Sequence, residues 1–167
     1  MQDGIEQLIR DYGRDIYSFC VYLTGNKDMA DDLYQQTFLV ALSKNEIDFK
    51  GNPKSYLLSI AVNVRNNQRR KMLWRREKFE TVPLENEELI GGTTDTESEI
   101  LRKERDMEIR KAVSALPEKM RQVVVLFYTE EMSISQISEI LNVSEGTVKS
   151  RLHNARKELK KRMKDYE

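Results

Sequence analysis

The chain has 167 residues, 34% of them charged and 39% hydrophobic, and its 28 basic and 28 acidic residues give a net charge of zero. No apolar run approaches the roughly 20 residues that a membrane-spanning helix needs, and the acidic, amphipathic N-terminus differs from a secretory signal, so we expect a cytoplasmic protein. With one cysteine and one histidine in the chain, we expect no internal disulfide and no Cys/His metal site.

The first half of the chain is expected to form three helices. Apolar residues recur at helical spacing from residue 5 to residue 23, and a Gly-Asn pair ends this run. A second helix is predicted over residues 30–43, with aspartates near its start, where negative charge suits the helix dipole. After a polar loop, Pro53 begins a third helix in the first-turn position that proline tolerates.

The helical pattern is lost over residues 79–100, which contain seven acidic residues, no basic residue and a Gly-Gly pair. We therefore expect a flexible acidic linker over residues 79–108, long enough to hold two small domains well apart. Helical spacing resumes near Leu101, and Pro117 precedes a further helix. The β-branched residues within 123–128 favour a strand locally, but their helical neighbours indicate a tightly packed helix.

Residues 133–160 have the pattern of a helix-turn-helix. Ser133 and Gln136 form a capping box that begins one helix, Asn142 suits a tight turn, and Ser144 is a candidate N-cap for the next helix. Apolar residues line one side of this second helix, and its other side carries basic and polar residues. A helix with such a face fits the major groove, where Arg and Lys can pair with guanine and Asn with adenine.

The net charge of zero conceals four blocks of opposite sign. Residues 1–48 carry nine acids and four bases, and residues 79–108 carry ten acids and three bases. Residues 54–78 carry eight bases and one acid, and residues 145–164 carry eight bases and two acids. Long helices expose basic residues in any case, but they usually intersperse glutamate among them. The two basic blocks therefore indicate two separate contacts with a polyanion.

No pattern in the chain indicates catalysis. There is no glycine-rich phosphate loop, nucleophile elbow or metal signature, so we expect no enzyme, no cofactor and no small-molecule substrate. The carboxylates of Asp31, Asp32, Glu130 and Glu131 are better explained by helix-start electrostatics and solvated turns than by acid–base chemistry. Cys20 is expected to be a small buried residue. For Tyr56 and Trp74, a core position and a role in stacking on DNA bases both stay open.

Three stretches resemble one family of proteins. They are ADDLYQQTFLVAL at residues 30–42, SYLLSIAVNV at 55–64 with its basic continuation, and the stretch at 116–159 that ends in SEGTVKSRLHNARKEL. Together they resemble the extracytoplasmic-function (ECF) sigma factors, small relatives of sigma-70. The resemblance implies an all-α fold of two small helical domains: region 2 at residues 1–78 and region 4, the helix-turn-helix, at 109–167.

The resemblance also implies which residues bind each partner. For reading of the −35 promoter element it implies Ser144, Thr147, Lys149, Ser150, Arg151, His153, Asn154 and Lys157. For recognition and melting of the −10 element it implies Phe49, Asn63, Arg65, Asn67 and Arg70. For docking on the β′ coiled coil of RNA polymerase it implies Asp32, Leu33, Gln35, Gln36, Thr37 and Phe38. The other implied partners are the β flap of the polymerase, promoter DNA and an anti-sigma factor.

Some residues depart from the family pattern. Tyr34 and Gln36 stand where Val and Glu are common, Asn67 where Asp is common, and Asn154 where Arg is common.

The leading hypothesis is therefore a sigma factor that directs core polymerase to promoters. One alternative is a stand-alone helix-turn-helix regulator, although the chain has no added dimerisation heptads. Another is a helical adaptor whose basic faces bind an acidic protein. The net charge of zero predicts that the protein by itself binds DNA weakly, because phosphate neutralisation provides much of DNA affinity.

Overall fold

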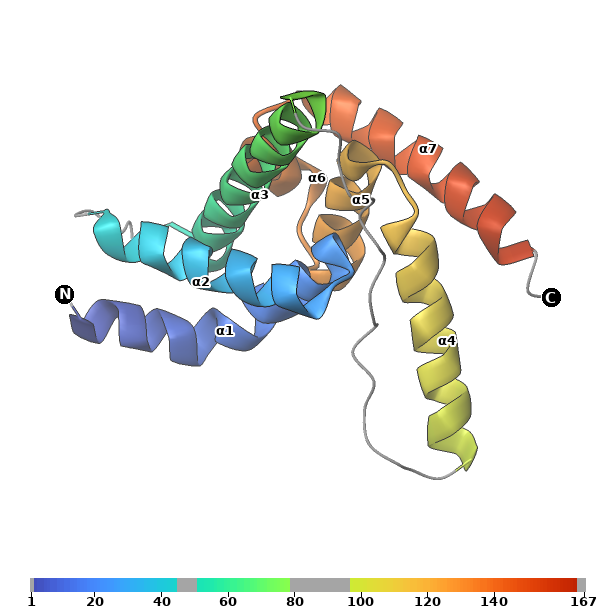
Figure 1. Ribbon diagram of the computed structural model, residues 1–167, viewed down its shortest axis with the longest axis horizontal. Coiled ribbons are helices and arrows are strands. Elements are labelled where there is room, and N and C mark those ends of the chain that lie inside the picture. Colours follow the sequence, from blue (N-terminus) through green and yellow to red (C-terminus); the bar gives the residue numbers. More distant parts are fainter. Residues whose placement is uncertain (1, 45–50, 79–96, 165–167) are drawn as a thin grey trace.

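The computed structural model describes residues 2–44, 51–78 and 97–164, and its regular elements within these ranges are all helical. The expected all-α fold is confirmed. The helices, labelled in Figure 1, are α1 (Gln2–Thr24), α2 (Lys27–Ser43), α3 (Pro53–Lys78), α4 (Glu97–Ser114), α5 (Glu118–Val124), the π-helical turn η1 (Val125–Thr129), α6 (Ile134–Leu141) and α7 (Glu145–Lys164).

The helices α1 and α2 lie antiparallel and pack against each other (Figure 1). Gly25 makes the sharp turn between them with a φ of +66°, and the side chain of Asn26 accepts a hydrogen bond from the backbone N–H of Met29 at 3.0 Å. This N-cap satisfies a backbone donor that the first turn of α2 would otherwise leave unpaired. Cys20 is fully buried, as expected, and burial raises the pKa of its thiol to about 12.

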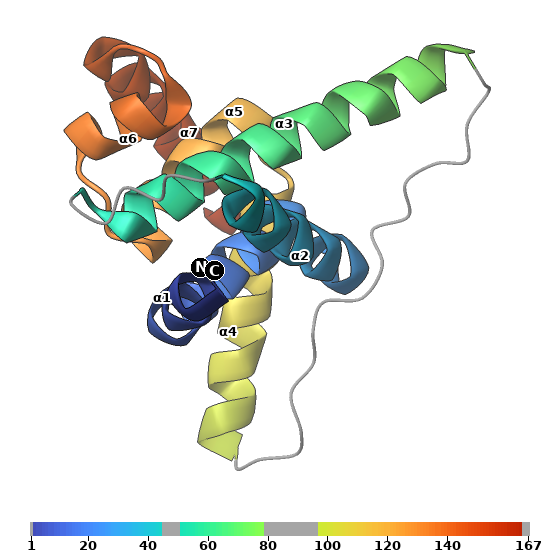
Figure 2. The same cartoon turned by 90° about the vertical axis from the view of Figure 1, so that its left-hand side faces the viewer.

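The helix α3 begins at Pro53, as the sequence predicts. The side chain of Asn52 accepts hydrogen bonds from the backbone N–H groups of Lys54 and Ser55, so proline occupies the first turn without leaving a donor unpaired. The first half of α3 packs on α1 and α2, whereas its C-terminal half extends away from the body of the protein (Figure 2). Trp74 lies on this extension and is 55% exposed, so it is not a core residue.

The helix α4 begins earlier than the sequence pattern indicates. Residues 97–108, expected in the linker, form its first turns, while the expected linker residues 79–96 lie outside the described residues. Only its C-terminal end, at Ala112 and Val113, is buried. The rest stands away from the other helices (Figure 1), so the acidic residues there have no core to disrupt and lie exposed on a helix surface.

The helix-turn-helix is confirmed in its details. Ser133 and Gln136 form the predicted capping box, and Asn142 adopts the left-handed conformation with a φ of 54°. The Ser144 hydroxyl accepts a hydrogen bond from the Thr147 backbone N–H at 3.1 Å and so caps α7. The helices α6 and α7 pack on each other, and Ile137 and Leu152 are among the residues buried in their apolar stripes. Residues 123–128 are helical, as expected, and α5 passes into the π-helical turn there.

The two halves of the chain pack on each other through one continuous hydrophobic core. The helix α3 contacts α6, and α1 contacts both η1 and α4. Figure 2 shows α5 and α6 lying directly beside α3. The two halves are therefore in contact in this arrangement, although the expected linker is long enough to let them lie apart.

Replacing Gly25 with alanine is expected to destabilise the fold by at least about 1 kcal/mol, because a left-handed φ costs an L-residue roughly 1–2 kcal/mol. The added Cβ would also lie 2.5 Å from the Ser114 hydroxyl of α4. Chemical denaturation measures the loss. In a Ser114→Gly background, the part of the stability loss that comes from the clash with Ser114 should disappear, while the part that comes from the left-handed φ should remain.

Gly146→Ala is the matched control for this prediction. A Cβ at Gly146 would meet only the Ser144 hydroxyl at 3.8 Å, and the residue has no positive φ. The change should leave stability the same or raise it by up to about 1 kcal/mol, since alanine favours helices. Equal stability of wild type and the Gly25→Ala variant would contradict the role given to this turn.

Candidate nucleic-acid interface

The outer face of α7 carries the residues expected to read DNA. Ser150, His153, Asn154 and Lys157 are exposed, and their spacing places them on the side of the helix away from its buried stripe, with the exposed Lys149 at one edge of this face. Arg151 is half-buried at the edge of this face, near the capping residues Ser144 and Thr147. The structure therefore brings the whole predicted −35 set onto one accessible surface at and after the start of the helix.

A second surface lies on α3, where Asn63, Asn67 and Arg70 are exposed at helical spacing. The guanidinium of Arg70 donates a hydrogen bond to the side-chain oxygen of Asn67. Phe49, predicted for the same surface, lies outside the described residues. These three exposed residues form a polar strip beside the basic C-terminal half of α3, which suits a nucleic-acid backbone.

Arg65 corrects one expectation for this surface. It is 5% exposed, and its guanidinium Nε donates to Glu118 Oε1 at 3.0 Å across the boundary between the two halves. Arg65 therefore does not face DNA in this arrangement. Helical periodicity accounts for the difference, because Arg65 lies two residues from both Asn63 and Asn67 and so points to the opposite side of α3.

Glu118, at the start of α5, is the acidic centre of this boundary. Its carboxylate is buried and also accepts a hydrogen bond from Arg121 Nη1 at 3.0 Å, while Arg69 Nε lies 3.8 Å away. Arg121 in turn donates to the backbone carbonyl of Leu23 at 2.9 Å. Nearby, Gln122 Nε2 donates to Asn66 Oδ1 at 2.9 Å. These bonds join α5 to α3 and to the end of α1.

Lys54 makes a second charged contact between the halves. Its ammonium lies 3.2 Å from Glu130 Oε2, and it also lies 3.6 Å from Asp15. Glu130 is only 2% exposed, which corrects the expectation that it lies in a solvated turn. Burial raises the pKa of Glu130 to about 7, against the smaller opposite effect of Lys54, and the negative charges of Asp15 and Glu131 add to the rise.

The exposed side of α2 is the candidate polymerase-docking surface. Asp32, Gln35 and Gln36 are exposed there, as the docking role requires. Leu39 and Leu42, which the sequence reading did not include, are 57% and 47% exposed on the same side. The sequence could have revealed them, because Leu39 and Leu42 follow Gln36 by three and six residues. This spacing places two apolar side chains on the polar side of the helix.

Three other residues expected to dock on the polymerase are instead buried. Leu33 and Thr37 have no exposed surface, and Phe38 is 7% exposed. The Thr37 hydroxyl donates to the backbone carbonyl of Leu33 at 2.7 Å. Buried and exposed residues alternate along α2 because each helical turn has side chains on both its core side and its solvent side. The three buried residues therefore support the candidate docking surface from the core and are not part of it.

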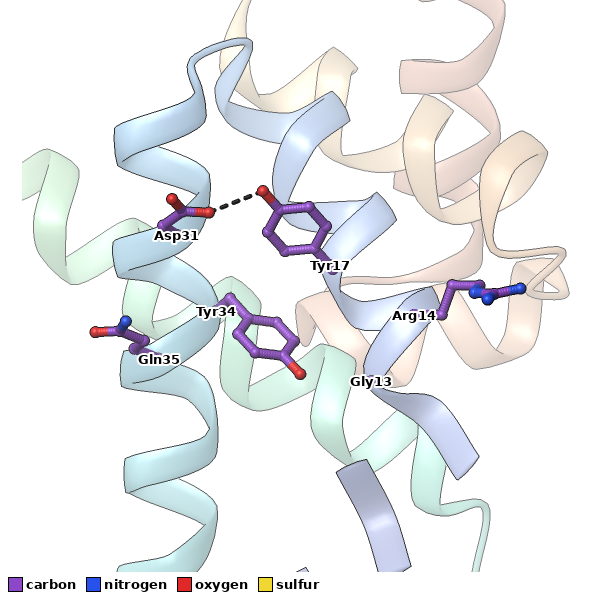
Figure 3. Close-up of a pocket in the computed structure, with 6 residues that line it drawn as sticks. All are labelled: Gly13, Arg14, Tyr17, Asp31, Tyr34 and Gln35. Atoms are coloured by element: carbon purple, nitrogen blue, oxygen red, sulfur yellow. Dashed lines mark hydrogen bonds between the residues drawn. The ribbon is translucent and has the colours of Figure 1, made fainter. Parts of the chain in front are cut away.

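A shallow groove between α1 and α2 borders the docking surface (Figure 3). The hydroxyl of Tyr17 donates to Asp31 at 2.8 Å, and the Tyr17 and Tyr34 rings meet edge to face with centroids 5.5 Å apart. Tyr34 reaches across to Gly13, where a Cβ would lie 3.1 Å from its hydroxyl. In the described part of the chain no three His, Cys, Asp or Glu side chains are grouped to hold a metal ion.

The Glu118 contacts predict a large stability effect. Glu118→Gln should destabilise the protein by about 3–5 kcal/mol, because it leaves the buried Arg65 and the half-buried Arg121 without their compensating charge. Glu158→Gln is the control, since Glu158 pairs with Lys161 at 3.9 Å on the surface and its change should alter stability by less than about 1 kcal/mol. Urea denaturation of both variants tests this, and similar small losses would argue against a central role for Glu118.

Glu130 predicts a pH dependence of stability. Its pKa is about 7 in the folded protein and near 4.5 for an ordinary glutamate, so the folded state binds the proton more tightly. Stability from this group is therefore complete below about pH 4.5 and is lost as pH rises through 7. Glu130→Gln, which resembles the protonated acid, should be more stable than wild type at pH 8 and nearly equal at pH 4.5.

Thermal melts of wild type and variant across this pH range make the measurement. Glu139→Gln, an exposed substitution on α6, serves as the control and should follow the wild-type curve. Parallel curves for wild type and the Glu130→Gln variant would show that Glu130 does not titrate with the raised pKa.

Comparison with known proteins places this geometry in a family. The family model for sigma-70 region 2 matches residues 8–76, and that for sigma-70 region 4 matches residues 106–159. The RNA polymerase sigma factor YlaC of Bacillus subtilis is 31% identical, covering 97% of this chain and 93% of its own. The ECF RNA polymerase sigma factor SigW of the same organism is 28% identical, covering 98% and 91%.

Solved structures agree on the fold. The sigma factor RpoE, in complex with the anti-sigma factor NepR from Bartonella quintana, superposes with a TM-score of 0.81 at 23% identity, covering 98% of both chains. CnrH, in complex with the cytosolic domain of CnrY, has a TM-score of 0.66 at 20% identity, covering 99% of this chain and 90% of its own. None of the helices described here is long and apolar enough to cross a membrane. On its two matched regions and its relatives, this chain belongs to the sigma-70 family, as an RNA polymerase sigma factor of the ECF type.

Proposed function

We propose that this chain directs core RNA polymerase to promoters through three of its surfaces. The outer face of α7 would read the −35 element, the exposed strip of α3 would bind the −10 element, and the exposed side of α2 would dock on the β′ coiled coil. The observation that carries the proposal is the pair of separate basic surfaces, one on α3 and one on α7, both exposed. Two such surfaces suit two contacts on one DNA duplex.

The proposed domain boundaries follow these surfaces. Residues 1–78 would act as region 2 and residues 109–167 as region 4, with residues 79–108 between them. The helical start of α4 at Glu97 shortens the part of this stretch that can act as a connector to residues 79–96. Fully extended, those 18 residues would reach about 60 Å.

The proposed function requires the two halves to separate. In the closed arrangement Asn66, beside Asn67 of the −10 strip, is bonded to Gln122 of α5, and α5 packs directly on α7. The axes of α3 and α7 are therefore separated by two helix–helix packing distances, roughly 16–20 Å. Promoter elements centred near −10 and −35 lie about 25 base pairs apart, or about 85 Å at 3.4 Å per base pair. The closed chain cannot span that distance.

The proposed partners follow from the same role. Core polymerase would bind through its β′ coiled coil and β flap, and promoter DNA through the two basic surfaces. An anti-sigma factor is proposed as a further partner, because two structural relatives were solved with a bound partner: RpoE with the anti-sigma factor NepR, and CnrH with the cytosolic domain of CnrY. A protein that binds bacterial RNA polymerase would act in the cytoplasm. The polymerase itself would carry out RNA synthesis, so we assign no catalytic residue, cofactor or small-molecule substrate to this chain.

In vitro transcription with bacterial core polymerase tests the proposal. Adding the full chain to core enzyme and a fragmented genomic template should give transcripts that start at a shared upstream motif, while core enzyme alone should give none. Absence of promoter-specific transcripts on every template would overturn the sigma-factor role. Gel shifts of the protein without polymerase separate the alternatives: nanomolar specific binding would favour a stand-alone regulator, and absence of any salt-dependent DNA binding would favour a protein adaptor.

Two substitutions should separate the two DNA contacts. Arg151→Ala is expected to weaken binding to the −35 element by about 1–3 kcal/mol if it pairs with a base edge. Asn63→Ala should impair opening at the −10 element more than binding at the −35 element, because it lies on α3. Promoter-complex assays with DNA altered at one element at a time measure both, and each variant is the control for the other. Equal effects of both variants at both elements would contradict the assignment.

A further inference from the structure

One arginine beside the DNA-reading face of α7 is held by aromatic side chains. The Nε of Arg156 donates to the hydroxyl of Tyr128 at 2.7 Å, and its guanidinium carbon lies 5.7 Å from the ring centroids of both Phe127 and Tyr128. The two rings meet edge to face with centroids 4.9 Å apart. Contacts of a cation with ring faces fix the position of a side chain that is otherwise long and mobile.

The π-helical turn η1 places these rings. Its backbone bond from Glu130 N–H to the carbonyl of Val125 spans five residues, one more than in an α-helix. Along the turn Leu126 is fully buried, Phe127 is half-buried and Tyr128 is 53% exposed. Tyr128 is therefore an exposed aromatic residue with a bonded hydroxyl, which is an arrangement suited to position a neighbour.

The charge of Arg156 is not neutralised by any residue that the structure describes. Its side chain makes no ion pair with a described carboxylate, in contrast to Arg65 and Arg121, which bind Glu118. Because Nε is bonded to Tyr128, the two terminal amino groups remain to donate outward. A guanidinium with both amino groups available matches the two oxygens of a phosphate group.

The position of Arg156 on α7 indicates a backbone contact rather than a base contact. At about 100° per residue, Arg156 lies roughly 120° around the helix from Ser150, on the edge of the face rather than at its centre. Lys149 and Lys160 are exposed along the same edge, seven residues before and four residues after Arg156. A row of positive charges along the edge of a recognition helix lies where the wall of the major groove, and therefore a phosphate backbone, would be.

We propose that Arg156 binds a phosphate of the DNA strand flanking the −35 element, and that Tyr128 and Phe127 act as positioning residues for its guanidinium. This inference rests on the proposed function, because it assumes that α7 enters the major groove. It adds a sequence-independent contact to the base-reading residues of the same helix.

A salt titration of promoter binding tests the inference. RNA polymerase holoenzyme, reconstituted from core enzyme and the full chain, is titrated onto a double-stranded promoter fragment between 50 and 200 mM KCl. Arg156→Ala should remove about one phosphate contact, so wild type should lose about 3.5-fold more affinity over this range than the variant does. Tyr128→Phe keeps the ring and the arginine charge, so it should weaken binding about two- to tenfold while leaving the salt dependence unchanged.

Arg102→Ala is the matched control, because Arg102 is an exposed arginine on the part of α4 that stands away from the other helices. It should match wild type in both affinity and salt dependence. Circular dichroism of every variant checks that the fold is retained. Changing the bases of the −35 element should not alter the effect of Arg156→Ala, since a phosphate contact carries no sequence information.

Three results would overturn the inference. An unchanged salt dependence for Arg156→Ala would remove the phosphate contact while leaving the sigma-factor role intact. A loss that depends on base sequence would make Arg156 a base-reading residue. A loss of affinity for core polymerase without DNA would assign the cluster to a protein contact. Wild-type holoenzyme without any promoter-selective binding would instead overturn the proposed function, and the −35 phosphate contact with it.

Discussion

The carboxylate of Glu118 is the charge around which the two halves of this protein are arranged. It is buried at the start of α5 and accepts hydrogen bonds from Arg65 of α3 and from Arg121 of its own helix. Removing a carboxylate from water costs several kcal/mol unless its partners are well placed. Arg121 completes the arrangement by donating to backbone carbonyls at Leu23, Ser114 and Leu116. One acid therefore sets the positions of the end of α1, the middle of α3 and the α4–α5 connection.

Under the proposed function, this dependence means that the closed arrangement and promoter binding would exclude each other. The resemblance to ECF sigma factors implies that Arg65 faces the −10 element, but the structure pairs it with a carboxylate inside the protein. A guanidinium pairs well with one anion at a time. While Arg65 is paired with the Glu118 carboxylate, it cannot pair in the same way with a DNA phosphate. Separation of the halves would expose Arg65 and Arg69 together on α3. The same step would bring Lys54 and Glu130 into water, where the glutamate regains an ordinary pKa.

Local signals in the sequence predicted much of the fold, because capping and turn chemistry act within a few residues. The capping box at Ser133, the left-handed Asn142 and the first-turn Pro53 were predicted and lie where expected. Contacts between distant residues could not be predicted in this way. Glu118 bonds to a residue 53 positions away, and the backbone carbonyl of Glu130 to one 76 positions away. The family resemblance named residues of α2 but not their direction, so Leu33, Thr37 and Phe38 were assigned to a surface although they belong to the core.

The π-helical turn η1 connects the boundary between the two halves to the proposed DNA-facing surface of α7. The run of β-branched residues before it crowds a regular α-helix, and widening the turn at Val125–Thr129 changes the direction in which the next side chains point. Glu130 then points inward to Lys54, whereas Tyr128 points outward to Arg156. Tyr128 and Glu130 lie two residues apart, so their side chains leave the turn on roughly opposite sides. The same turn therefore supplies an acid that contacts the other half of the protein and the ring whose hydroxyl bonds to Arg156. Separating the halves breaks the first contact and leaves the second intact, because Arg156 and Tyr128 both belong to region 4.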